Sequence, residues 1–527
     1  MNVRRWFSHA WLILVGLFML QWLVLFSIKQ PTWDAVSYYI YARSVVFDRD
    51  LDFENDYQLS FPTAGEHFAS KRLDQVTTAT GRVANLFAVG AASIWLPWLA
   101  VLKALEPVFF PGQTMTGYEN YYVTSLATLS ALWGLLAFWI ALRLAQGIVD
   151  KPMALAATIT LFFTSPLLYY QFREPMYAHA TSALVVALCV YVWSKQHDRL
   201  VATHKALLLG GLIGLAGLVR WQNLSYLLLP LTSIIILLWK LPGHKRRESF
   251  APAIFYILWV IVAAVAVFLL QMSVWKVIYG SFITIPQGSA FFDLRAPFLD
   301  SLLLSSFRGV LTWMPIFLFA FAGLIVLSGR KQQLGIPLLV MLIAALYING
   351  STRDWFAGGG YGPRRLSGTL AILVVGYAAF LDWLPARIRR QSAVILGVLL
   401  ALHQWVLLRF GLPERIGGRV ISMEPSYSWE EVPLLVFLTE ILKKLPEAFR
   451  RPLDFFVLTD SPLDLILRQN VWPAQHLMSL AIGVVFLLLI LTAGYILSKR
   501  SGTVVYMILL AVLVFGLLNL WILAGSG

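Results

Sequence analysis

Six acidic side chains gather in a short stretch that directly follows the first long apolar run of this 527-residue chain. The stretch spans residues 29–57, and its acids are Asp34, Asp48, Asp50, Asp52, Glu54 and Asp56. A charge at the centre of a bilayer costs at least ~2.5–3.5 kcal/mol, so acids beside an apolar run are expected to face water or a substrate. The stretch therefore predicts a polar site at the edge of a membrane.

Asp34 is the first of these acids, and the aromatic residues Trp33 and Tyr38 lie beside it in the sequence. A carboxylate at this level could accept a proton from a hydroxyl group and act as a general base. The same residue is a good N-cap for a helix that begins directly after it. The two roles are compatible, and we predict that Asp34 is catalytic.

The other acids of the stretch could bind a divalent cation, because hard cations take carboxylate oxygens as ligands. Their spacing fits no calcium loop, since the required glycine and terminal glutamate are missing. A solvated turn with helix caps is the simpler interpretation. Asp50 and Asp52 are weak candidates for metal ligands, and we expect neither a metal nor another cofactor.

Arginines at the ends of apolar runs are candidates for binding an anion. Arg220 lies in GLVRWQN between two such runs, and Arg364 and Arg365 follow the run GGGYGP. A planar guanidinium matches the geometry of a phosphate group, and glycines let a backbone approach a ligand closely. The alternative roles are snorkelling to the interface and anchoring a span there. Lys71 and Arg72 in SKRL give a weaker phosphate signal.

Two short polar segments supply further candidates for the lining of a pocket. Glu174 and His179 lie in QFREPMYAH, and Trp355 and Tyr361 lie in STRDWFAGGGYGPRR. A lone histidine at the start of a span is more often structural, but His179 could also contact a phosphate or an acceptor. One acid and several arginines around a cavity at membrane level suit a lipid-phosphate substrate. The arginines would stabilise the charge on the leaving phosphate, and Asp34 would accept the proton of an incoming hydroxyl group.

The composition of the chain indicates the class of protein in which these residues lie. The chain is 59% hydrophobic and only 13% charged, which excludes a soluble domain and indicates an integral membrane protein. The formal net charge of +14 would suggest nucleic acid on a soluble protein. Here the basic residues lie mostly in short loops between apolar runs. The positive-inside rule and attraction to anionic lipids explain this distribution, so no nucleic-acid partner is expected. The single cysteine, Cys189, allows no intrachain disulfide.

About thirteen apolar runs approach the ~20 residues that a span requires. They are 10–28, 121–145, 153–170, 178–194, 205–219, 222–240, 251–278, 308–328, 335–350, 364–383, 392–408, 476–497 and 503–523. The start MNVRRW followed by the first run predicts an uncleaved signal anchor with a cytoplasmic N-terminus. Basic loops such as 195–199, 242–248 and 329–333 then lie in the cytoplasm.

The apolar run 84–104 is left out of this count, because including it would reverse the side of every later basic loop. We expect it to form a helix or helix pair in the outer interface, inside a first external loop of about 29–120. The predicted organisation is a transmembrane catalytic module at 1–408, a large external loop at 409–475 and two C-terminal spans within 476–527. An amphipathic helix at 432–449 is expected in that loop.

Four segments in order resemble the GT-C superfamily of polyprenyl-phosphate-dependent glycosyltransferases, in the branch near bacterial protein O-mannosyltransferases and the lipid A aminoarabinose transferase. They are the acid with YYIYARSVVFDRDLDFENDY, then TGRVANLFAVGAASIWLPW, GLVRWQNLSYLLLP and DWFAGGGYGPRRL. The resemblance covers roughly residues 5–380. It departs at Trp33-Asp34-Ala35, where many relatives have Gly-Asp-Glu or Pro-Asp-Glu, so the second acid is missing.

The resemblance implies an all-α, GT-C-like bundle of a bacterial cytoplasmic membrane with its active site on the external face. It also implies an inverting transfer of a hexosyl or pentosyl group from a polyprenyl-phosphate donor to a lipid, glycan or protein acceptor. Asp34 would be the general base, and Arg220 with Arg364 or Arg365 would hold the donor phosphate without a metal.

Two other functions remain open. A transporter or flippase of lipid-linked sugars usually shows internal repeats and polar residues at the membrane midplane, and this chain shows no evident repeat. A noncatalytic relative that binds lipid-linked sugar would differ from an enzyme only in an activity assay.

Overall fold

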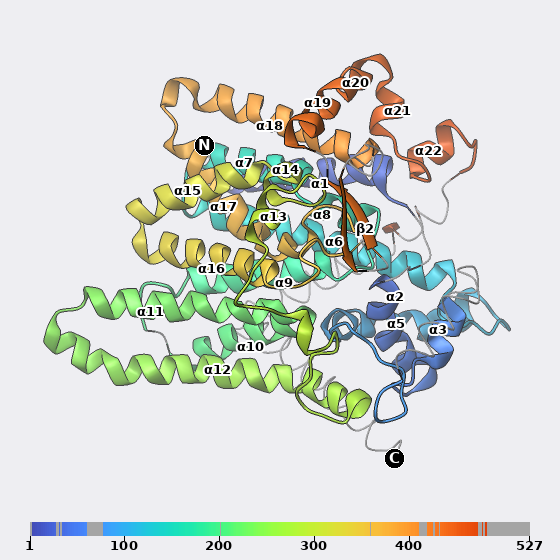
Figure 1. The fold of residues 1–527 in the computed structure, drawn as a ribbon, viewed down its shortest axis with the longest axis horizontal. Coiled ribbons are helices and arrows are strands. Elements are labelled where there is room, and N and C mark those ends of the chain that lie inside the picture. The colour runs from blue at the N-terminus through green and yellow to red at the C-terminus, as the bar shows by residue number, and fades with distance from the viewer. Residues whose placement is uncertain are drawn as a thin grey trace.

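A computed structural model describes residues 3–27, 31, 34–60, 77–200, 202–358, 360–410, 419–424, 427–431, 433–472, 477 and 480–481. These residues form a bundle of helices that run roughly side by side (Figure 1). Their one sheet is a two-stranded antiparallel ribbon of β1 (Arg419–Glu424) and β2 (Tyr427–Glu431). The expectation of an all-α bundle is confirmed, with this ribbon as a small addition.

Seven of the described helices are long and apolar enough to cross a membrane. They are α5 (Gly90–Phe109), α6 (Asn120–Gln146), η2 with α11 (Trp221–Leu227 and Leu228–Lys240), α12 (Gly243–Tyr279), α16 (Gln332–Gly350), η4 with α17 (Arg364–Thr369 and Leu370–Trp383) and α18 (Ala386–Phe410). Shorter apolar segments are the Ala10–Leu25 part of α1 (Val3–Leu25) and the helices α7 (Lys151–Thr164), α9 (His179–Ser194), α10 (Thr203–Val219) and α15 (Ile316–Arg330). The protein is a multi-pass membrane protein. The expected spans 476–497 and 503–523 lie almost wholly outside the described residues.

Small residues let neighbouring helices of the bundle pack backbone to backbone. A Cβ added at Gly323 of α15 would lie 1.8 Å from the carbonyl oxygen of Gly376 in α17. Because lipid tails are as apolar as the helices, close van der Waals packing of this kind drives helix association in a membrane. A larger side chain at either glycine would push α15 and α17 apart.

The apolar run 84–104 corresponds to a single helix, α5, which begins at Gly90. It has the length and composition of a span, and it packs against α10 and against α2 (Asp34–Arg43). A Cβ at Gly90 would lie 2.3 Å from the backbone of Leu218, so the start of α5 touches the end of α10. The interfacial position expected for this run stays a prediction.

The acidic stretch folds into α2, the π-helix η1 (Ser44–Asp48) and α3 (Glu54–Ser60). Arg43 pairs there with Asp48 and, at 3.2 Å, with Asp56, which is fully buried. The interpretation of the acids as a solvated turn is therefore wrong for Asp56. Arg43 and the hydroxyl of Tyr118 contact this carboxyl group inside the fold, and the sequence spacing alone does not show these contacts.

The remaining helices are short. They are α8 (Leu167–Phe172), η3 (Ser289–Phe291), α13 (Leu299–Leu304), α14 (Val310–Trp313), α19 (Leu434–Lys444), α20 (Glu447–Arg450), α21 (Pro452–Phe456) and α22 (Pro462–Leu467). Helices α19 and α20 occupy the segment expected to be amphipathic. Phe437 and Ile441 of α19 are buried, whereas Leu435 and Leu442 are exposed.

Candidate functional site

The ion pair between Asp34 and Arg364 is the centre of the candidate site. Asp34 is the first residue of α2, Arg364 is the first residue of η4, and Oδ2 of the acid lies 2.6 Å from Nη1 of the arginine. Their side chains are 20% and 12% exposed. The pair is thus largely enclosed but still within reach of a ligand.

The glycine-rich run before Arg364 wraps around its side chain. Arg364 Nε donates to the carbonyl of Ala357 at 2.9 Å, and both Ala357 (φ 62°) and Gly362 (φ 56°) have left-handed backbone conformations. A Cβ at Gly360 would lie 2.6 Å from both Arg364 Nε and the hydroxyl of Tyr170. A larger residue there would force the Arg364 side chain or the Tyr170 hydroxyl to shift, because the chain passes within contact distance of both.

His179 fixes the position of a second arginine. Arg220 has an extended backbone (φ −152°, ψ 118°) between α10 and η2, and its Nη1 lies 2.6 Å from Nδ1 of His179. A guanidinium has no acceptor, so Nδ1 must accept this hydrogen bond and the buried imidazole is neutral. His179 therefore orients Arg220 and is not placed to donate a proton from Nδ1.

Buried tyrosines form one wall of the site. The guanidinium carbon of Arg364 lies 5.3 Å from the ring centroid of Tyr177, and the ring centroids of Tyr170 and His179 are 4.2 Å apart. Burial raises the pKa of Tyr38 and of Tyr177, and the Asp34 carboxylate acts in the same direction. Their hydroxyl groups therefore stay neutral and can donate hydrogen bonds to a ligand.

The two consecutive arginines point in different directions. Arg365 pairs with Asp354 at 2.6 Å and donates to the hydroxyl of Thr352 at 2.6 Å, whereas Arg364 pairs with Asp34. Burial lowers the pKa of Arg220, and the charges of Arg364 and Arg365 act in the same direction. The cluster thus holds three mutually repelling guanidinium groups against two carboxylates, which favours an anionic ligand.

Trp355 and Tyr361 are the other aromatic residues that the sequence predicts for the pocket. Trp355 is buried and contacts Phe356 edge to face, with the ring centroids 5.6 Å apart. The ring of Tyr361 stacks on that of Tyr169, with the ring centroids 4.8 Å apart. Its backbone bonds to the Tyr170 hydroxyl, which accepts from the NH of Tyr361 at 2.6 Å and donates to its carbonyl at 3.2 Å.

Glu174 lies between α8 and α9, and its charge acts on the Tyr177 hydroxyl. It is a further carboxylate near the site, beside Asp34 and Asp354. Lys71 and Arg72 lie outside the described residues.

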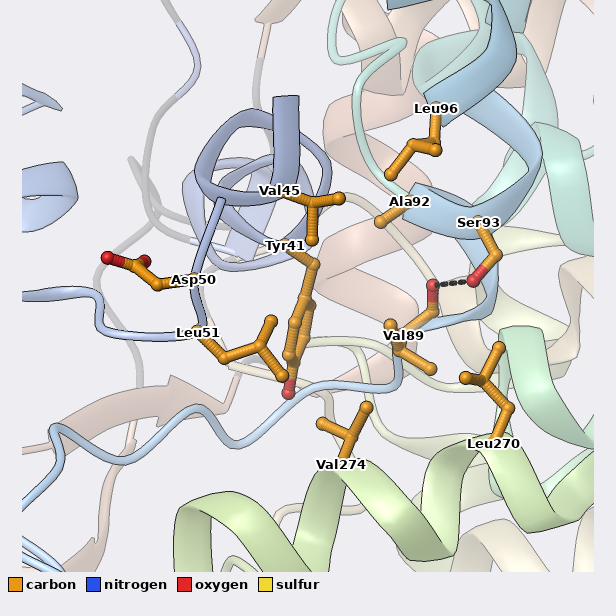
Figure 2. A pocket seen from close by; sticks show the side chains of 10 residues that line it. All are labelled: Tyr41, Val45, Asp50, Leu51, Val89, Ala92, Ser93, Leu96, Leu270 and Val274. Atoms are coloured by element: carbon orange, nitrogen blue, oxygen red, sulfur yellow. Dashed lines mark hydrogen bonds between the residues drawn. The ribbon is translucent and has the colours of Figure 1, made fainter. Parts of the chain in front are cut away.

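Asp50 and Asp52, the weak metal candidates, are part of the turn between η1 and α3. Asp50 Oδ1 accepts hydrogen bonds from the hydroxyl of Ser44 at 2.7 Å and from the backbone NH of Asp52 at 3.1 Å. Figure 2 shows the Asp50 carboxylate pointing away from an apolar crevice formed with Tyr41 and Val274. Within the described part of the chain, no three metal-ligating side chains come together.

Arg308 is a residue near the site that the sequence reasoning missed. It is 3% exposed, its guanidinium carbon lies 4.7 Å from the ring centroid of Trp313, and its charge acts on Tyr170. Arg308 opens an apolar run just as Arg220 does, so the same criterion could have identified it. Tyr170 and Tyr177 had no distinguishing signal, because many tyrosines flank spans.

No model of a known protein family matches the chain, and no curated protein matches it. Among solved structures, the chain is similar to ArnT from Cupriavidus metallidurans bound to undecaprenyl phosphate, with a TM-score of 0.49 and 14% identity over 92% of this chain and 76% of that chain. It is also similar to the archaeal oligosaccharyltransferase AglB from Archaeoglobus fulgidus in complex with an inhibitory peptide and a dolichol-phosphate. There the TM-score is 0.44 and the identity 14%, over 86% of this chain and 55% of that chain. These values describe a partial likeness of overall arrangement.

Proposed function

We propose that this protein is an inverting glycosyltransferase that moves a sugar from a polyprenyl-phosphate donor to a hydroxyl acceptor at the external face of a bacterial cytoplasmic membrane. The observation that carries the proposal is the contact between Asp34 and Arg364 in a cluster that also holds Arg220. It brings a carboxylate that can accept a proton next to cations that can hold a phosphate. The donor class rests on the sequence resemblance described above.

Donor binding would release the base in this scheme. The donor phosphate competes with Asp34 for the guanidinium of Arg364, because charge-assisted hydrogen bonds to phosphate oxygens can replace the bond at 2.6 Å. The freed carboxylate then accepts a proton from the acceptor. Asp34 would thus become an effective base only after the donor has entered.

The transfer itself is a single displacement. The acceptor oxygen forms a bond to the anomeric carbon while its proton passes to Asp34. The bond from that carbon to the phosphate oxygen breaks, and the oxygen keeps the electron pair. Arg364 and Arg220 stabilise the charge that develops on the leaving phosphate, so the proposal includes no metal. One displacement inverts the configuration at the anomeric carbon.

Rigid support of the arginines is part of the proposed mechanism. Arg220 is held by the neutral His179, and Arg364 is held by the carbonyl of Ala357 and the ring of Tyr177. Cations that are already in place need little reorganisation when the charge develops, which is the main source of electrostatic catalysis.

The test is a transfer assay with purified protein, a panel of radiolabelled polyprenyl-phosphate sugars and a membrane extract as the source of acceptor. The wild type should consume one donor, Asp34→Asn should fold but transfer at least ~100-fold more slowly, and the control Asp50→Asn should retain activity. Equal rates for wild type and Asp34→Asn would make Asp34 a helix cap and direct attention to Glu174.

Consumption of no donor by the wild type would contradict the enzyme. Translocation of lipid-linked sugar in vesicles would then test the transporter, and donor binding without transfer would identify a noncatalytic relative.

A further inference from the structure

A second polar recess lies between three segments of the chain, far from Asp34 in the sequence. Its volume is about 420 Å³, and its walls are mostly polar. The segments are the end of α9, the end of α11 and the turn between α15 and α16. The residues that line it are His197, Asp198, Lys240, Gly329, Arg330, Lys331, Gln332, Gln333 and Leu334.

The recess lies at the opposite end of the bundle from the Asp34–Arg364 pair. Helix α9 begins at His179 of the site, and α16 ends at Gly350, directly before the loop that carries the partners of Arg365. At 1.5 Å per residue, the 19 residues of α16 span about 28 Å, which is close to the thickness of a membrane core. In Figure 1 the turn between α15 and α16 lies at the left and α2 lies at the right.

Positive charge predominates in the recess. Lys240, Arg330 and Lys331 face one carboxylate of the lining, Asp198. Arg330 is partly balanced by Asp382 at 3.6 Å, and Lys331 donates to the carbonyl of Ile148 at 2.9 Å.

Lys240 is less constrained than the two cations beside it. None of the hydrogen bonds or ion pairs between described residues involves its ammonium group. The positive charge of the recess is therefore free to attract an anion, and the side-chain N–H groups that line the recess can donate hydrogen bonds to it.

The apolar surface beside the recess indicates what kind of anion fits. Trp239, the neighbour of Lys240, is 73% exposed, and Ile235, about one turn earlier on α11, is 58% exposed. On a span these side chains face lipid, and a tryptophan near the end of a span lies at the headgroup level. A ligand with a charged head and apolar chains can use both surfaces, whereas a soluble phosphate can use only the recess.

We propose that this recess binds the phosphate headgroup of an anionic membrane lipid, whose acyl chains lie along the exposed apolar face of α11. The proposal goes beyond sugar transfer, because the recess is about a membrane thickness away from the transfer site. It differs from general attraction to an anionic surface because it requires particular side chains around one cavity.

The experiment measures retention of defined lipids by the full-length protein. Purified protein in neutral detergent is mixed with phosphatidic acid, phosphatidylglycerol or phosphatidylcholine, and the bound lipid is counted by native mass spectrometry. The recess variant is Lys240→Gln with Arg330→Gln. The control, Lys245→Gln with Arg247→Gln, removes the same number of charges from exposed residues of α12 outside the recess.

The wild type should retain the two anionic lipids and not phosphatidylcholine. The recess variant should bind them roughly 30-fold more weakly, and the control should change less than about threefold. Equal losses in both double variants, or equal retention of phosphatidylcholine, would overturn the proposal.

A steric variant separates the cavity from its charge. A Cβ at Gly329 would meet no heavy atom within 4 Å, so Gly329→Trp can be accommodated without a clash at its first side-chain atom. It should reduce lipid retention although no charge is lost, and unchanged retention would contradict binding inside the recess. Competition by millimolar inorganic phosphate as effective as that by lipid would identify a soluble ligand and overturn the lipid assignment.

Discussion

The carboxylate of Asp34 and the guanidinium of Arg364 are in direct contact at 2.6 Å, although 330 positions separate them in the chain. Each group therefore affects what the other can bind. Asp34 offsets one of the cations of the site, and Arg364 occupies an oxygen that a base would need. An anionic donor and Asp34 must therefore compete for the same guanidinium.

This competition predicts opposite effects of Asp34→Asn on binding and on turnover. Binding of polyprenyl phosphate should become about threefold to tenfold tighter, because the internal anion is removed. Transfer should fall by roughly 100-fold or more, because no base remains. Equilibrium binding and initial rates measured on the same preparation check both effects. Weaker binding by Asp34→Asn would show that the carboxylate helps to hold the ligand and does not compete with it.

Gly360→Ala should disturb the site without removing any functional group. The added methyl would lie 2.6 Å from both Arg364 Nε and the Tyr170 hydroxyl, so the pair with Asp34 and the tyrosine beside it must rearrange. We expect transfer to fall roughly 10- to 100-fold, because misplacement of a binding group by about 1 Å has effects of this size. The control is Gly16→Ala in α1, where a Cβ meets no heavy atom within 4 Å. Wild-type activity of Gly360→Ala would show that the exact position of Arg364 is unimportant.

His179→Phe should act on donor binding through Arg220. The phenyl ring keeps much of the packing but cannot accept the hydrogen bond of 2.6 Å from Arg220. The KM for the donor should rise about tenfold, which corresponds to about 1.4 kcal/mol for one charge-assisted hydrogen bond. His179→Gln, whose amide oxygen can accept, should restore part of the affinity. A loss confined to kcat in both variants would instead place His179 in the chemical step.

Asp56 should make the stability of the protein depend on pH. Burial raises its pKa to about 7, with the Asp48 carboxylate adding to the effect and Arg43 opposing it. The folded protein therefore holds a proton that the unfolded chain releases near pH ~3.9. The free energy of unfolding should fall by an amount on the order of 3 kcal/mol as the pH rises from about 4 to about 7.

Thermal unfolding of the wild type and of Asp56→Asn across this pH range checks the prediction. The difference between their unfolding midpoints should shift in favour of Asp56→Asn as the pH rises. Asp52→Asn, at an exposed position of the same stretch, is the control and should follow the wild type. A constant difference between wild type and Asp56→Asn would contradict a titrating Asp56.

Several features of this protein could be predicted from the sequence because they depend on composition and local spacing. The high share of apolar residues indicated a membrane protein. The run GGGYGP before Arg364 indicated that the backbone there approaches another group closely. The position of Arg220 between two apolar runs marked it as a buried or interfacial cation. These inferences needed only the cost of charge in lipid and the conformational freedom of glycine.

The tertiary structure decided which of these groups meet. Arg364 and Arg365 are neighbours in a 3₁₀ turn, where successive side chains point about 120° apart, so only one of them can reach Asp34. The sequence contained no signal for choosing between them, because the choice depends on how α2 packs beside η4. In the same way, Asp56 is buried against Arg43 and Tyr118, and these contacts depend on the packing of the stretch and not on its spacing.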